Sequence, residues 1–326
     1  MKTVFIINPK AGQGKDIEKL AENIKNAAET LKKDYEIYFT NSAGDAKRFV
    51  CEYLKEKGVA RFVACGGDGT LSEVVNGAIS YGDAEVGVIP IGTGNDFCRN
   101  FGSADTFLDI KAQLLSKTQK CDAINYKTTV NGKEISGYAV NMFNIGFDCN
   151  VADMTSKMKQ KPFISGSFAY LISIFAVLIK KKGANLNITT DGQRVHSGKL
   201  LLTSVANGSF CGGGVMSNPL ASVTDGLINM NIIKNVSRLR LLTLLPCYMK
   251  GTFPQKNVGH IIYSEKFKKI VIEPLDNYMR LCVDGEITDA GICEFEVISK
   301  AFNFVVPKNS LETDFLDKST ESLSRV

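Results

Sequence analysis

Short apolar runs alternate with amphipathic stretches over about the first 120 residues of the chain. Thr3–Ile7 is an unbroken apolar run, which is typical of a parallel strand covered on both faces. Between Ile17 and Leu31 the apolar residues recur at helical spacing. The same patterns predict strands at Glu36–Thr40, Arg61–Cys65 and Glu85–Ile89, and helices around Ala46–Lys57 and Leu71–Ile79. This order predicts an open parallel sheet with helices on both faces, whose ligands bind at the carboxyl ends of the strands.

The pattern changes after about residue 121, where hairpin signals appear at Val130–Lys133 and Thr190–Gln193. Strand-like runs follow at Lys199–Ala206, Leu227–Ile233, Lys269–Ile272, Met279–Val283 and Cys293–Ile298, with helices near Ser167–Ile179 and Val236–Lys250. We therefore predict an α/β domain over residues 1–121 and an antiparallel β-sandwich domain over residues 122–306. The polar segment 307–326 is interpreted either as a tail that packs back on the first domain or as a frayed end.

Composition narrows the class of protein. With 326 residues, 44% of them hydrophobic, the chain is long enough for two folded domains and is not disordered. The net charge of +5 comes without a dense basic stretch, so it does not indicate a nucleic-acid partner. The nine Cys lie singly and the two His lie far apart, which excludes a clustered zinc site. Scattered thiols without a signal peptide predict a reduced, cytoplasmic protein.

One stretch, Phe163–Ile179, is apolar enough to suggest a membrane, and Lys180–Lys182 follow it. It is shorter than the roughly 20 apolar residues that a bilayer span needs. The favoured interpretation is a buried helix, ahead of a membrane-surface helix and of a transmembrane span.

Three glycine-rich loops follow three predicted strands. The first, Asn8–Lys15, is not a Walker A loop, because Pro9 replaces a required glycine and Asp16 follows the lysine. It is either a phosphate cradle or an ordinary turn. The second, Gly66–Thr70, has three glycines around Asp68, which favours phosphate binding over a capped tight turn in which Asp68 is only an Asx-turn residue. Thr70 can cap the following helix and donate to phosphate. Together with the third, Pro90–Phe97, these loops predict a nucleotide-phosphate site on one edge of the sheet.

The second half contains further candidates. Asp284-Gly285-Glu286 follows the apolar strand-like run Met279–Val283. Taken alone, this Asp-Gly sequence favours a hairpin turn. With the nucleotide loops elsewhere in the chain, we interpret it as a pair of catalytic carboxylates. Asp225-Gly226 has the same ambiguity and is a candidate for an oxygen-only Mg²⁺ site. Gly212–Gly214 indicate either a close backbone approach or a flexible loop.

These motifs together resemble the diacylglycerol kinase catalytic domain, of the soluble bacterial lipid kinase type. The residues that carry the resemblance are Asn8-Pro9 with Gly12, GGDGTLSEVVNG at 66–77, PIGTGNDF at 90–97, Asp225-Gly226-Leu227 and Asp284-Gly285-Glu286. The resemblance covers essentially the whole chain. It implies a Rossmann-like nucleotide-binding domain, a β-sandwich lipid-substrate domain and an active site in the cleft between them.

The resemblance also implies roles for individual residues. The nucleotide ATP would be contacted by Asn8, Pro9, Lys10, Ala11, Gly12, Thr40, Gly66, Gly67, Asp68, Gly69, Thr70, Leu71, Ser72 and Thr93. A structural Mg²⁺ would be held around Asp225, with help from Ser222 and Leu227. Glu286 would accept the proton of the substrate hydroxyl, and Asp284 would bind Mg²⁺ or orient that hydroxyl.

We therefore expect an ATP- and Mg²⁺-dependent kinase that phosphorylates a lipid hydroxyl, foremost that of diacylglycerol, giving phosphatidic acid. The alternatives are another lipid (a polyprenol, a sphingoid base or phosphatidylglycerol), a soluble substrate as in NAD kinases, and a regulator that binds nucleotide without catalysis. Such an enzyme would be cytoplasmic and would visit the anionic inner face of the membrane. The resemblance also suggests a homodimer.

Overall fold

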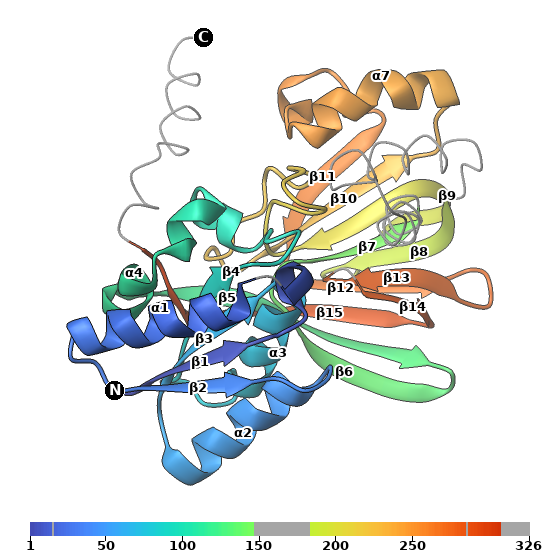
Figure 1. The fold of residues 1–326 in the computed structure, drawn as a ribbon. Coiled ribbons are helices and arrows are strands. Elements are labelled where there is room, and N and C mark those ends of the chain that lie inside the picture. Colours follow the sequence, from blue (N-terminus) through green and yellow to red (C-terminus); the bar gives the residue numbers. More distant parts are fainter. Residues whose placement is uncertain (15, 147–182, 285, 308–326) are drawn as a thin grey trace. The chain divides into compact units, whose positions relative to one another are not determined.

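The computed structural model describes residues 1–14, 16–146, 183–284 and 286–307 (Figure 1). Our predictions for Lys15, for the helix near Ser167–Ile179 with Lys180–Lys182, for Gly285 and for the tail beyond Pro307 lie outside these residues. The chain divides into two compact units. The first comprises Met1–Gly92, Phe101–Gln119 and the residues from Asn303, and the second comprises Thr93–Asn100 and Lys120–Phe302. The domain limits 1–121 and 122–306 stay a prediction, because a compact unit need not fold independently.

The first unit has a parallel sheet in the order β2-β1-β3-β4, and the end of β15 pairs with β4 in the same direction. Its strands are β1 (Thr3–Ile7), β2 (Tyr35–Phe39), β3 (Arg61–Gly66) and β4 (Glu85–Pro90). Between and after them lie η1 (Ala11–Gly14), α1 (Ile17–Thr30), α2 (Asp45–Lys57), α3 (Asp68–Ala78), η3 (Ala104–Leu108) and α4 (Ile110–Leu115). The short helix η2 (Cys98–Phe101) belongs to the second unit except for Phe101. The predicted strand and helix order is thus present.

Helices cover both faces of this sheet (Figure 1). On one face, α1 and α4 pack through Ile24 and Leu114 against alternate strand residues such as Phe5 and Val63. On the other face, the Tyr53 ring of α2 meets the Phe62 ring edge-on, with 5.4 Å between ring centroids. The central strands are buried on both faces, which explains why β1 and β3 are continuous apolar runs.

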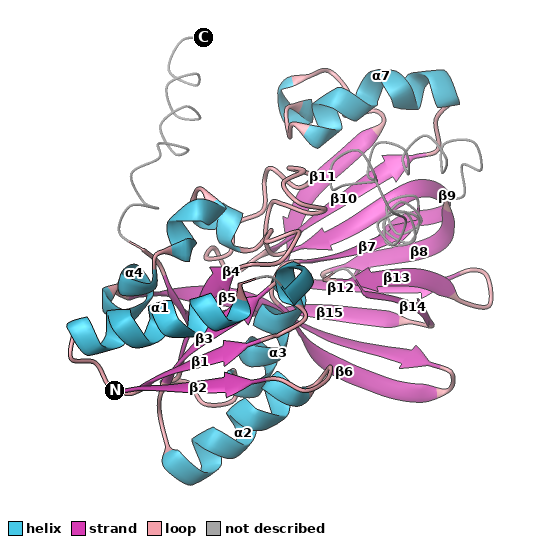
Figure 2. Cartoon of the chain, viewed as in Figure 1, coloured by secondary structure: helices cyan, strands magenta, loops and turns pink. Residues whose placement is uncertain are grey.

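The second unit is mainly antiparallel β-structure, as predicted (Figure 2). Its elements are β5 (Thr118–Val130), β6 (Lys133–Ala139), β7 (Met142–Gly146), β8 (Ala184–Thr190), β9 (Gln193–Ala206), β10 (Ile228–Lys234), α7 (Arg238–Met249), η4 (Phe253–Gln255), β11 (Ile262–Phe267), β12 (Lys269–Pro274), β13 (Met279–Val283), β14 (Glu286–Ala290) and β15 (Cys293–Val305). Both predicted hairpins are present, since Val130 pairs with Lys133 and Thr190 with Gln193.

Strand β9 belongs to two layers, because its first half pairs with β8 and its second half pairs with β7 and β10. One layer runs β6-β5-β15-β12-β8-β9, and the other runs β14-β13-β7-β9-β10-β11. The core between them is apolar, and the rings of Phe143 and Phe295 lie 4.6 Å apart there. This arrangement is a β-sandwich, so the predicted fold class is confirmed.

Helix α7 covers the outer side of this sandwich. Its buried residues Leu241 and Leu244 pack against Leu202 of β9 and Ile233 of β10. Over the described ranges, no helix combines the length and the apolar composition that crossing a bilayer requires.

Candidate functional site

In the first unit, three predicted loops lie side by side at the carboxyl ends of β1, β3 and β4. The Asn8 N–H donates to the Cys65 carbonyl at 3.0 Å, and the Gly92 N–H donates to the Gly66 carbonyl at 3.2 Å. Gly12 has a φ of +59°, and a Cβ there would lie 2.9 Å from the Ile91 carbonyl oxygen. The structure therefore brings the first two loops and the start of the third together, as their places after parallel strands predict.

The turn between β3 and α3 is tied to the first loop through Thr70. The buried Thr70 hydroxyl accepts a hydrogen bond from Asn8 Nδ2 at 3.2 Å. A Cβ on Gly66 would collide with the Thr70 side chain, and a Cβ on Gly67 would lie 3.3 Å from Gly92 Cα. The two glycines thus let the three loops approach closely.

The helix after this turn begins earlier than we predicted. α3 starts at Asp68 rather than near Leu71, and Gly67 is its N-cap. The expectation that Thr70 caps the helix is therefore wrong, because Thr70 lies within the first turn and bonds to Asn8. Asp68 instead places a carboxylate in the first turn, which suits the positive end of the helix dipole. A helix N-terminus beside glycine turns is a common site for phosphate.

The other predicted nucleotide-binding residues of this unit differ in how exposed their side chains are. Gly69 and Lys10 are exposed, and Pro9, Ala11, Asp68 and Ser72 are half-buried. Leu71, in contrast, has a buried side chain, and its N–H donates to the Gly67 carbonyl within α3. The Lys10 N–H donates to Asn8 Oδ1 at 3.0 Å, which shapes the first loop.

Thr40 follows β2, next to the first loop. Its N–H donates to the carbonyl of Ile7 at 2.9 Å. The segment after it is held by the buried Asp45, which accepts from the Asn41 N–H at 2.9 Å. This hydrogen bond, with those from Arg48 and Tyr38, holds the pKa of Asp45 below its usual range. Sequence reasoning missed this anchor, because one Asp at a helix start carries no distinctive signal.

In the second unit, the end of the third loop is anchored by Asp96. Its buried carboxylate accepts from the N–H groups of Gly213 and Gly214, at 3.0 Å and 2.7 Å. Thr93 lies in the same loop, exposed, and its carbonyl would be 3.5 Å from a Cβ on Gly213. The glycine run is therefore a close backbone approach to the loop that carries Thr93. Sequence reasoning singled out both segments but did not pair them.

Asp284 and Glu286 lie where β13 and β14 pair in antiparallel fashion, with Val283 opposite Glu286. The Asp284 oxygens accept from the N–H groups of Met142, at 3.1 Å, and Val140, at 3.3 Å. Its own N–H donates to the Met142 carbonyl, and its φ is +42°. Asp284 thus fixes the turn to the start of β7, and Glu286 begins β14. The strands β13 and β14 therefore pair as the hairpin interpretation predicts. The catalytic roles of Asp284 and Glu286 stay predictions.

Asp122 is a further anchoring carboxylate that sequence reasoning missed. It is fully buried and accepts from the N–H groups of Lys300, at 2.7 Å, and Gly226, at 2.6 Å. It thereby fixes the turn that carries Asp225. A lone Asp in a strand-like run is the only signal that the sequence offered.

The predicted metal residues do not assemble a Mg²⁺ site as they lie here. The Asp225 carboxylate is paired with the Lys266 ammonium at 2.6 Å, and its other oxygen accepts from the Leu227 N–H at 3.1 Å. The Ser222 hydroxyl lies 3.3 Å from that of Thr224. Mg²⁺ requires oxygen ligands with near-octahedral geometry, and the one carboxylate already has a cation beside it. In the described ranges no three His, Cys, Asp or Glu side chains form a metal-binding group. A metal at Ser222, Asp225 and Leu227 stays a prediction.

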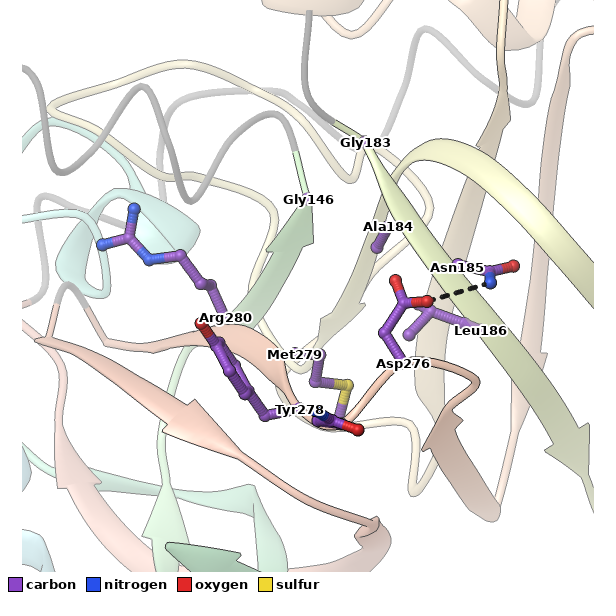
Figure 3. A pocket seen from close by; sticks show the side chains of 10 residues that line it. Gly146, Gly183, Ala184, Asn185, Leu186, Asp276, Tyr278, Met279 and Arg280 are labelled. Atoms are coloured by element: carbon purple, nitrogen blue, oxygen red, sulfur yellow. Dashed lines mark hydrogen bonds between the residues drawn. The ribbon is translucent and has the colours of Figure 1, made fainter. Parts of the chain in front are cut away.

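A cavity of about 390 Å³ lies at the other end of β13 (Figure 3). Asn185 Nδ2 donates to Asp276 Oδ1 at 3.3 Å on one side of it, and Tyr278 and Arg280 are on the other. None of the residues that line it is a predicted site residue, so the sequence motifs do not account for it.

Comparisons with known proteins decide the family. Residues 2–126 match the diacylglycerol kinase catalytic domain, and residues 141–306 match the YegS C-terminal NAD kinase beta sandwich-like domain. The chain belongs to the diacylglycerol kinase catalytic-domain family of lipid kinases. The predicted family and enzyme class are therefore confirmed.

Relatives of this family resemble the chain over nearly all of its length. A probable lipid kinase YegS-like from Yersinia enterocolitica is 29% identical over 94% of this chain and 97% of its own. A diacylglycerol kinase from Bacillus subtilis is 28% identical, with the same coverage of both chains. A crystal structure of a putative diacylglycerol kinase from Bacillus anthracis superposes with a TM-score of 0.72 at 24% identity, covering 94% of this chain and 98% of that one. It shows the shared fold.

Proposed function

We propose that this lipid kinase transfers the γ-phosphoryl group of ATP to the free hydroxyl of diacylglycerol, giving phosphatidic acid and ADP. One observation carries the proposal: in a chain of this family, glycine turns follow three parallel strands and contact one another at Asn8, Gly66 and Gly92. The Bacillus subtilis relative, named a diacylglycerol kinase, supports the choice of lipid.

The first unit supplies the phosphate-binding groups in this proposal. The backbone of Gly12 and the N-terminus of α3 face phosphate oxygens, and the Asn8–Thr70 hydrogen bond holds the two loops in register. Asp68 would hold the Mg²⁺ that accompanies ATP, which would neutralise phosphate charge, and Thr40 and Thr93 would contact the nucleotide. Phosphoryl transfer depends mainly on such alignment and on neutralising phosphate charge.

The second unit supplies the proton acceptor. The lipid hydroxyl oxygen bonds to the γ-phosphorus, the bond from that phosphorus to the β–γ bridging oxygen breaks, and ADP leaves. Glu286 takes the hydroxyl proton. Asp284 positions the turn that carries Glu286, through its hydrogen bonds to the N–H groups of Val140 and Met142.

We also propose that the enzyme acts from the cytoplasm on the anionic inner face of the membrane. Diacylglycerol is insoluble, so its kinase must visit a bilayer to find it. We expect the protein to bind anionic vesicles, and this binding to weaken with added salt. The homodimer stays a prediction.

A substrate panel tests the proposal. Purified protein is incubated with Mg-ATP and vesicles that carry diacylglycerol, a polyprenol, a sphingoid base or phosphatidylglycerol, and separately with NAD. Products are identified by mass spectrometry. We expect phosphatidic acid as the main product. If another lipid is phosphorylated faster, that lipid replaces diacylglycerol as the proposed acceptor. Phosphorylated NAD would support a soluble substrate. Nucleotide binding without any phosphorylated product would contradict the proposal that the protein is a kinase of these substrates.

A further inference from the structure

The outer face of helix α7 is the most apolar exposed helix surface that we find in the described residues. Leu239 has 78% of its surface exposed, the largest fraction of any large hydrophobic residue described. Leu242, Thr243 and Pro246 follow it at helical spacing and are also exposed. The opposite face is anchored in the core through Leu241 and Leu244. The leucines therefore point outward on a fixed helix.

The segment of the chain that contains this helix has charges of one sign. Between Asp225 and Glu265 the chain has no acidic residue at all. Over the same stretch it has five basic residues, namely Lys234, Arg238, Arg240, Lys250 and Lys256. Five positive charges equal the net charge of the whole chain, +5, so the rest of the protein is neutral on balance.

The helix dipole suits Lys250 at the C-cap of α7, but it does not explain the two arginines. Arg238 and Arg240 lie in the first turn of α7, where the helix dipole favours acidic residues and disfavours cations. Ser237 already caps the helix, since its hydroxyl accepts from the Arg240 N–H at 3.2 Å. Exposed leucines and cations are the two kinds of side chain through which a surface helix binds an anionic bilayer.

We propose that the outer face of α7 is the membrane-docking surface of this protein. Leu239 and Leu242 insert among the acyl chains, while Arg240 and Lys250 contact lipid phosphates. This inference rests on the proposed function at one point: an enzyme with a lipid substrate must bind a bilayer to reach it. Docking itself needs neither ATP nor catalysis.

Vesicle sedimentation without nucleotide tests the docking surface. The full-length chain is compared with Leu239→Gln/Leu242→Gln and with Arg240→Gln/Lys250→Gln, on phosphatidylcholine vesicles with and without phosphatidylglycerol. We expect the wild type to bind the anionic vesicles, and binding to weaken with salt. Loss of two cations lowers the binding constant by about 30-fold, and loss of the two leucines lowers it by at least about tenfold.

Two controls match these variants. Lys25→Gln/Lys55→Gln removes two exposed cations from α1 and α2, and Leu115→Gln removes a leucine that is 56% exposed. Both bind like the wild type if α7 is the docking surface. Wild-type binding by the α7 variants, or equal losses in the controls, would overturn the proposal. So would leucine variants that only turn a dimer into a monomer in sedimentation velocity while vesicle binding is kept.

Kinase activity on a dispersed short-chain diacylglycerol separates this proposal from the proposed function. The α7 variants should keep that activity and lose only the activity on vesicles. If no variant and no wild type phosphorylates any lipid, the proposed function fails, and the sedimentation result still decides the docking surface.

Discussion

Single buried carboxylates fix the loops of the second unit. Asp96 and Asp122 both accept hydrogen bonds from backbone N–H groups that lie more than 100 positions away in the sequence. Hydrogen bonds to a charged group contribute about 1.5–3 kcal/mol each, and a buried donor left without its acceptor costs a similar amount. These residues therefore act on the site through the backbone that they position.

The substitution Asp96→Asn tests whether this carboxylate positions the loop that carries Thr93. The substitution removes the negative charge and replaces Oδ2, which accepts from the Gly213 N–H, with an amide NH₂ that cannot accept. We therefore expect the free energy of unfolding to fall by about 2 kcal/mol. Loosening the loop should also lower phosphoryl transfer more than the stability loss alone explains. Urea denaturation and a kinase assay measure the two effects. Asp83→Asn, an exposed change of the same kind, is the control, and unchanged activity in Asp96→Asn would contradict the positioning role.

At the scale of elements, the ion pair between Asp225 and Lys266 links the turn before β10 to strand β11. The resemblance implied a Mg²⁺ at this carboxylate, and the Lys266 ammonium lies beside the same carboxylate. Both side chains are partly exposed, so the pair contributes only on the order of 1 kcal/mol.

Metal removal tests which cation holds this turn. We expect the melting temperature of the nucleotide-free protein to be the same in Mg²⁺ and in EDTA, because Lys266 already neutralises Asp225. Lys266→Met should lower the melting temperature in EDTA, and Mg²⁺ should restore part of it. Lys269→Met, which removes an exposed partner of Glu294, should show no such rescue. A wild-type melting temperature that falls in EDTA would show that a metal holds the turn.

The elements also show how far the sequence could predict the fold. The two-sided burial of β1, β3 and β4 leaves continuous apolar runs, so the parallel sheet was predictable. β10 was harder, because its alternation of Asn229 and Asn231 with apolar residues is typical of a solvent-facing side. Both amides are in fact buried and bond to Asn218 and Ser217. The local sequence pattern cannot show that polar side chains of a strand are covered by a segment elsewhere in the chain.

The same limit applies to the site. Glycine turns after strands were predictable, because parallel topology alone places them together. The pairing of Asp96 with Gly213 and Gly214 was not, because it depends on how distant segments fold. The start of α3 was missed by three residues, since Gly67 was assigned to the turn rather than to the N-cap.

At the scale of the whole molecule, the proposed reaction uses both units: the glycine turns of the first would bind phosphate, and Glu286 of the second would accept the proton. The family comparison gives the kinase class, and the proposal assigns the two units to one reaction. That reaction needs both the loops around Thr70 and the turn at Glu286. Substitutions at either of these two places should therefore lower transfer to the same lipid.

The most direct test is transfer of labelled phosphate from [γ-³²P]ATP to diacylglycerol in anionic vesicles. Glu286→Gln is compared with the wild type and with Glu296→Gln, an exposed control on β15. We expect labelled phosphatidic acid from the wild type and from Glu296→Gln. In Glu286→Gln we expect the rate of transfer to be lower by about 10²–10⁴-fold while ATP still binds. Wild-type transfer by Glu286→Gln, or no labelled lipid from the wild type, would contradict the proposed function.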